Sequence, residues 1–133
     1  MKLFFPTVIS FIAGGLVCLA SCGGGSAPKG TIGCSCRLFM SATCEGVEAP
    51  RGLEDDLLND CEMSFEPECI SKGGLYDPIL PCPSQNRFAV CEIELPTTGL
   101  VRIKVWKTPD WGDGDKTAIE ADCDGLGGAL RYE

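Results

Sequence analysis

A chain of 133 residues has room for one small domain, and its formal charge of −8 and lack of histidine argue against several functions. The acidic charge disfavours binding to nucleic acid, because phosphate backbones repel it. Without histidine there is no Ser-His-Asp or Cys-His nucleophile, no histidine-ligated zinc and no imidazole acid or base. The sequence therefore predicts that the protein is not an enzyme.

The N-terminal residues 1–21 have the pattern of an export signal. Residues 3–19 are uncharged and mostly apolar, and a proline and a glycine pair weaken any helix they form. The next motif, Leu19-Ala20-Ser21-Cys22, resembles the lipobox of bacterial lipoprotein precursors at all four positions. The resemblance implies removal of residues 1–21 and attachment of lipid to Cys22, which would anchor the protein in a membrane. The alternative is an ordinary secretory signal with a chance cysteine.

Residues 22–30 are predicted to carry the lipid and to form a flexible tether. They are rich in glycine and contain no side chain able to build a core, so they would hold the domain about 15 Å from the membrane. In lipoproteins, an aspartate after the lipidated cysteine is associated with retention in the inner membrane. Gly23 occupies that position here, which favours the outer membrane if the bacterium is diderm. The expected location is the cell envelope.

Residues 31–133 are predicted to form one disulfide-rich α+β domain, with an antiparallel sheet and two short helices. An even number of cysteines in a small exported domain indicates a disulfide framework of up to four bridges. The cysteines concerned are Cys34, Cys36, Cys44, Cys61, Cys69, Cys82, Cys91 and Cys123. One pairing is predicted individually, Cys91 with Cys123, which would join a hairpin to the second helix.

The first half of the domain contains one predicted strand and one predicted helix. Alternating apolar residues over 32–40 indicate a strand that presents Cys34 and Cys36 to the core. Leucines at helical spacing, preceded by acidic residues suited to a first turn, predict a helix over 53–63. A new local element is expected to start at Pro67 and to end at a glycine pair.

The second half is predicted to be a β-hairpin followed by a helix. The runs 88–95 and 100–107 have strand character, and Pro96-Thr97-Thr98-Gly99 is a turn between them. Thr117-Ala118-Ile119-Glu120 matches a capping box, so the helix is expected to start at Thr117 and to end at Gly127-Gly128.

The two helix ends share one motif. Cys69-x-x-x-Gly73-Gly74 and Cys123-x-x-x-Gly127-Gly128 have the same spacing, which predicts two related β-β-α units. The pattern is similar to small cysteine-rich C-x3-G-G repeats of exported bacterial proteins of unknown function. That resemblance implies no activity.

Acidic residues gather in two places. Nine carboxylates lie between Glu45 and Glu68, with Arg51 as the only base among them, and they are interpreted as a solvated face. The loop Asp110-Trp111-Gly112-Asp113-Gly114-Asp115 could suggest calcium, but the EF-hand register fails because position six is Ala118. The sequence thus predicts no metal, and no cofactor beyond the covalent lipid. The loop is interpreted as a turn whose acids cap the next helix.

Trp111, with Asp110, Asp113 and Asp115, is the candidate binding site. Trp111 is either a binding anchor or a lid over the core. The leading functional hypothesis is a non-catalytic binding or envelope-structural module whose partners are the membrane, through its lipid, and an envelope protein. The alternative is an acidic inhibitor of a basic envelope-active hydrolase.

Overall fold

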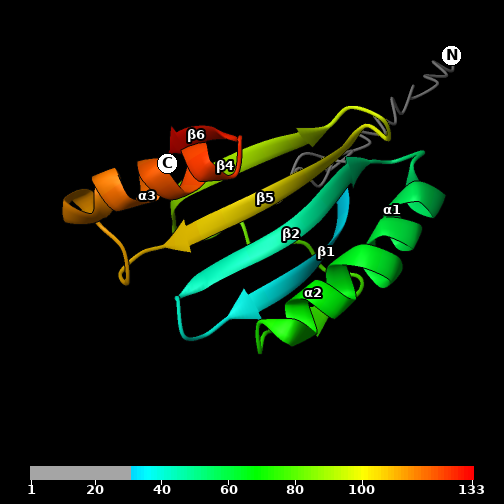
Figure 1. Ribbon diagram of the computed structural model, residues 1–133, viewed down its shortest axis with the longest axis horizontal. Coiled ribbons are helices and arrows are strands. Elements are labelled where there is room, and N and C mark those ends of the chain that lie inside the picture. Colours follow the sequence, from blue (N-terminus) through cyan, green and yellow to red (C-terminus); the bar gives the residue numbers. More distant parts are fainter. Residues whose placement is uncertain (1–30) are drawn as a thin grey trace, which may run out of the picture.

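The computed structural model describes residues 31–133 and shows an α+β domain built on one six-stranded antiparallel sheet (Figure 1). This is the predicted fold class. The predicted signal segment, Cys22 and the tether lie outside the described residues. The strands are β1 (Thr31–Leu38), β2 (Thr43–Pro50), β3 (Leu75–Asp77), β4 (Arg87–Leu95), β5 (Leu100–Lys107) and β6 (Ala129–Tyr132). The helices are α1 (Glu54–Asp60), a π-helical turn (Cys61–Phe65), α2 (Glu66–Ser71), a 3-10 turn (Asp113–Asp115) and α3 (Lys116–Gly125).

The sheet consists of two units with the same order of elements. In the first unit the β1–β2 hairpin is followed by α1 and α2 and then by β3, which pairs with β1. In the second unit the β4–β5 hairpin is followed by α3 and then by β6, which pairs with β4. β2 and β5 join the units, giving the order β3-β1-β2-β5-β4-β6. Each predicted β-β-α unit therefore has one further short strand.

All the helices cover the same face of the sheet. Cys36 is opposite Glu45, Glu45 is opposite Lys104, and Lys104 is opposite Cys91. Directly paired residues point to the same side of a sheet, so this row of four shares one face. Cys36 is bonded to Cys69 of α2 and Cys91 to Cys123 of α3, which places α2 and α3 on that face. Cys34, on the same face of β1, is bonded to Cys61 at the end of α1.

Four disulfides connect the sheet to the elements around it. Three lie on the helix face: Cys34–Cys61, Cys36–Cys69 and Cys91–Cys123. The fourth, Cys44–Cys82, is on the opposite face, where it attaches the segment between β3 and β4 to β2. Around it pack Val90, Ile103 and Val105, all nearly inaccessible to solvent. The Cys91–Cys123 bridge is the pairing predicted individually from the sequence.

Peptide mapping can test this connectivity directly. Digestion of the non-reduced protein should yield three disulfide-linked groups, because each pair of sulfur atoms lies at bonding distance and Cys34 and Cys36 stay on one peptide. The groups are Cys34-Ser35-Cys36 with Cys61 and Cys69, Cys44 with Cys82, and Cys91 with Cys123. Alkylation without reductant should label none of the eight cysteines of residues 31–133. A peptide that links Cys44 to any cysteine other than Cys82 would contradict the path of the β3–β4 segment over the sheet.

Two predicted boundaries in the first unit are wrong. The strand expected over 32–40 ends at Leu38, and Phe39 and Met40 form an exposed turn. The helix expected over 53–63 continues instead through the π-helical turn into α2. Pro67 does not separate the two helices, because it follows directly on the π-helical turn, in which the Glu66 N–H bonds to the Cys61 carbonyl.

The predicted capping box of the last helix is also wrong. The helix α3 begins at Lys116, and its N-cap, Asp115, makes no side-chain hydrogen bond to the helix backbone. The Asp115 carboxylate instead accepts a hydrogen bond of 3.0 Å from the Gly112 backbone N–H. Asp115 therefore closes the preceding turn. The predicted glycine stop is correct, since Gly127 has a φ of 71° and Gly128 donates its N–H to the Cys123 carbonyl.

Candidate functional site

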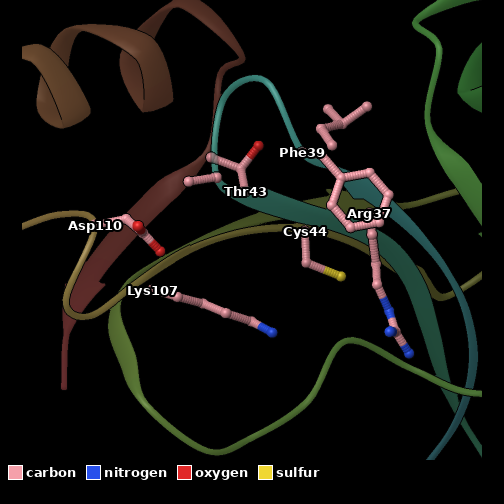
Figure 2. A pocket seen from close by; sticks show the side chains of 8 residues that line it. Arg37, Phe39, Thr43, Cys44, Lys107 and Asp110 are labelled. Atoms are coloured by element: carbon pink, nitrogen blue, oxygen red, sulfur yellow. The ribbon is translucent and has the colours of Figure 1, made fainter.

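A pocket of about 260 Å³ opens at one end of the sheet, where β1, β2 and β5 come together (Figure 2). Figure 2 shows Arg37 and Lys107 on opposite sides of Cys44, and Asp110 on the Lys107 side. The walls combine two cations, one carboxylate and several apolar groups. The lining residues are Arg37, Leu38, Phe39, Ala42, Thr43, Cys44, Lys107 and Asp110.

The strand register explains why the two cations meet. Arg37 is opposite Cys44, and Cys44 is opposite Val105, two residues before Lys107. Alternation along β5 then places Lys107 on the face that carries Cys44 and Arg37, away from the helices. The Cys44–Cys82 disulfide lies between them and holds the floor of the pocket in place.

A third cation stands beside the pocket. Arg87 is opposite Lys107 in the β4–β5 ladder. Its guanidinium donates hydrogen bonds of 2.8 Å to the backbone carbonyls of Pro83 and Cys82, and its charge also acts on the Glu48 carboxylate. Three positive charges therefore gather on a protein whose formal charge is −8.

Its surroundings change the pKa of Lys107. Burial lowers the pKa of Lys107 below its ordinary value, and the positive charges of Arg37 and Arg87 lower it further. Within residues 31–133, no carboxylate lies within ion-pair distance of the Arg37 guanidinium or the Lys107 ammonium. The pocket thus has an excess of positive charge that internal ion pairs do not neutralise.

The acidic loop that the sequence singled out does not form one site. Asp110 lines the pocket, whereas Asp113 pairs with Lys116 at 3.0 Å and Asp115 closes the turn at Gly112. Among residues 31–133, no three His, Cys, Asp or Glu side chains gather in a group that could hold a metal ion.

Trp111 packs onto the core of the second unit. It is partly buried against a cluster that includes Trp106, Ile119 and the Cys91–Cys123 disulfide. Its indole N–H is buried and has no hydrogen-bond partner within the described residues. This packing agrees with the interpretation of Trp111 as a lid over the core.

The acidic run from Glu45 to Glu68 is not a single solvated face. Glu45 accepts a 2.8 Å hydrogen bond from Lys72, which also donates to Glu68 at 2.7 Å. That bond from Lys72 is the main cause that lowers the pKa of Glu68. Lys104 extends the network, since its ammonium lies 2.7 Å from the Asp122 carboxylate and 3.9 Å from that of Glu45. These ion pairs connect α2, the sheet and α3 across the centre of the helix face.

Sequence reasoning missed Arg37 and Lys107. Each is a polar residue at the end of an alternating strand, which is ordinary for a solvent-facing position. Only the pairing of β1 and β5 with β2 brings them together. The composition does not single them out, because ten of the chain's 11 basic residues lie outside the acidic segments 45–68 and 110–115.

No helix within residues 31–133 is long and apolar enough to cross a membrane. No family model, no curated protein and no solved structure matches the chain.

Proposed function

We propose that the chain is a lipid-anchored protein of the bacterial cell envelope and acts there as a non-catalytic binding module. The observation that carries this proposal is the state of the cysteines. All eight within residues 31–133 are paired and at most 2% exposed. Disulfides persist in oxidising compartments outside the cytoplasm, which agrees with an export signal and a lipobox.

The binding role is supported by the pocket between Arg37 and Lys107. Its two cations lie on β1 and β5 of a sheet that four disulfides brace, and Phe39, Ala42 and Asp110 complete its wall from the adjoining turns. Thr31, the first described residue, starts β1 at the end away from the pocket, about 20 Å from Arg37 along the strand. A tether at Thr31 therefore leaves the pocket free.

The lipid anchor is tested by metabolic labelling with a fatty acid. The wild-type protein should carry the label, and Cys22→Ser should abolish it, because the thiol is the acceptor in the lipobox. Cys18→Ser is the matched control: it removes a cysteine four residues earlier, inside the signal segment, and should leave the label intact. Release of unlabelled wild-type protein into the medium would contradict the proposal.

A second candidate function, inhibition of a basic envelope hydrolase, has one observation in its favour. The outer side of the helices exposes Glu54, Asp55, Asp56 and Glu62, together with Leu58 and Met63. Carboxylates around apolar side chains suit a cationic protein surface. A pull-down from envelope extracts at low and high salt distinguishes the candidates, because only inhibition predicts one tight basic partner that salt releases.

A further inference from the structure

We propose that the pocket between Arg37 and Lys107 binds a small organic anion, with its carboxylate or phosphate group held by the two cations and its apolar part against Phe39. This inference names the ligand chemistry of the proposed binding role. Its test does not depend on the lipid anchor.

Like charges lie opposite each other beside the pocket. Lys107 lies directly opposite Arg87, and Arg37 is close enough for its charge to act on Lys107. Like charges placed opposite each other in a sheet reduce its stability. An anion between Arg37 and Lys107 would relieve this repulsion, so the arrangement favours a bound anion over an empty pocket.

The two cations have complementary chemistry for an anionic group. A guanidinium presents a planar set of donors that fits carboxylate and phosphate oxygens in pairs, and an ammonium adds a compact charge from another direction. Arg37 and Lys107 approach from β1 and β5, on the two sides of Cys44 (Figure 2). The anionic group would therefore lie over the Cys44–Cys82 disulfide.

The remaining walls of the pocket indicate what the rest of the ligand would be. Phe39 belongs to the pocket wall yet is 72% exposed, and Leu38 and Ala42 continue the same apolar wall. Asp110 adds a hydrogen-bond acceptor that repels a second anionic group. A volume of about 260 Å³ lies just below the usual range for small-molecule sites. The pocket therefore suits a compact ligand with one anionic end and one apolar or aromatic end.

The pocket lies far from the end of β1 where the tether would begin. Arg37 lies near the end of β1 that is farthest from Thr31, where the tether would begin. The pocket would then be displayed away from the membrane that holds the lipid. This position favours a free solute over a lipid headgroup of that membrane.

Isothermal titration calorimetry of the oxidised full-length chain in a non-ionic detergent tests the proposal. The probes are phenyl phosphate and benzoate, with benzylamine as the cationic counterpart of similar shape. We expect both anions to bind with a dissociation constant below about 1 mM and benzylamine not to bind. Affinity should fall as salt rises, because charge attraction drives binding.

Substitutions locate the binding. Arg37→Gln and Lys107→Gln should each weaken anion binding about tenfold or more, since each removes a charged donor. Asp110→Asn should strengthen it, because it removes the carboxylate that repels the ligand. Arg51→Gln is the matched control: it removes one positive charge from an exposed turn and should change affinity less than about twofold. Unchanged melting temperatures would show that the variants are folded.

Chemical labelling gives an independent readout. With its lowered pKa, Lys107 should react with a trace acylating reagent at mildly alkaline pH faster than exposed Lys116 does. Phenyl phosphate should protect Lys107 and leave Lys116 unprotected. Equal protection of both lysines would contradict the proposal.

The remaining outcomes are also decisive. Binding of benzylamine as tight as that of benzoate, absence of anion binding, or equal weakening by Arg51→Gln and Arg37→Gln would each overturn the proposal. Co-sedimentation of the unlipidated variant Cys22→Ser with phosphatidylglycerol vesicles, abolished by a further Arg37→Gln, would support the same anion chemistry and assign it to a lipid headgroup. A negative result here leaves the labelling of Cys22 unaffected, so the two proposals fail separately.

Discussion

Replacing Gly128 with alanine is expected to destabilise the second unit strongly. The new Cβ atom would overlap the Cys91 Sγ and would lie 3.0 Å from the Glu92 carbonyl oxygen. Overpacking a core costs about 1 to 3 kcal/mol, and more where the neighbours cannot move. Here the sulfur is held by its bond to Cys123 and the carbonyl belongs to β4, so neither can give way. Thermal unfolding followed by circular dichroism measures the loss.

The first unit offers the same test at Gly74. An added Cβ would overlap the Cys36 Sγ and would lie 2.9 Å from the Cys69 Sγ, so Gly74→Ala should be as damaging as Gly128→Ala. Gly125→Ala is the control, because that position lies in α3 and an added Cβ meets nothing within 4 Å. It should be neutral or stabilising by up to about 1 kcal/mol. A normal melting temperature for Gly128→Ala would contradict the close packing of the disulfide.

The repeated motif was visible in the sequence, but its physical reason was not. The pattern C-x-x-x-G-G predicted a helix end, and the first glycine of each pair meets that expectation with φ values of 70° at Gly73 and 71° at Gly127. The second glycine is required because a disulfide crosses above it. That contact depends on which cysteines pair, which spacing does not reveal.

Most of the sheet could be predicted where one strand face is uniformly apolar. The β4–β5 hairpin has such a pattern, and both strands lie within a residue of their expected bounds. The strand β2 was missed because its sequence, TCEGVEAP, contains glycine, proline and two glutamates. Gly46 lets it pack closely against β1, since a Cβ there would lie 3.0 Å from the Cys34 carbonyl oxygen. Such tertiary packing overrides local preference.

The candidate site could not be predicted, for a related reason. Arg37 and Lys107 lie far apart in the sequence and meet only through the register of three strands. The acidic loop drew attention because its residues are adjacent along the chain, yet the fold uses Asp113 and Asp115 locally and turns Trp111 onto the core. Only Asp110 of that loop reaches the pocket.

Removing the Cys91–Cys123 disulfide is expected to cause the other large loss of stability. The bridge joins residues 32 apart, so its loss should reduce the free energy of unfolding by about 3 to 4 kcal/mol through the greater freedom of the unfolded chain. Domains of this size have only about 5 to 15 kcal/mol in total. The double variant Cys91→Ala/Cys123→Ala avoids a free thiol that could exchange with the other disulfides. Denaturant unfolding of the variant and the wild type measures the difference.

The Asp113→Asn variant tests whether the acidic loop of the second unit binds a cation. The Asp113 carboxylate is exposed and contacts Lys116 within one helical turn, a kind of pair that contributes at most about 1 kcal/mol. Its replacement should therefore leave the melting temperature almost unchanged, with or without calcium. A genuine calcium site would raise the melting temperature of the wild type with added ion, because a ligand that binds only the folded state stabilises it, and Asp113→Asn would lose that increase. Such a shift would contradict the structural role of the loop and would make calcium part of the binding function.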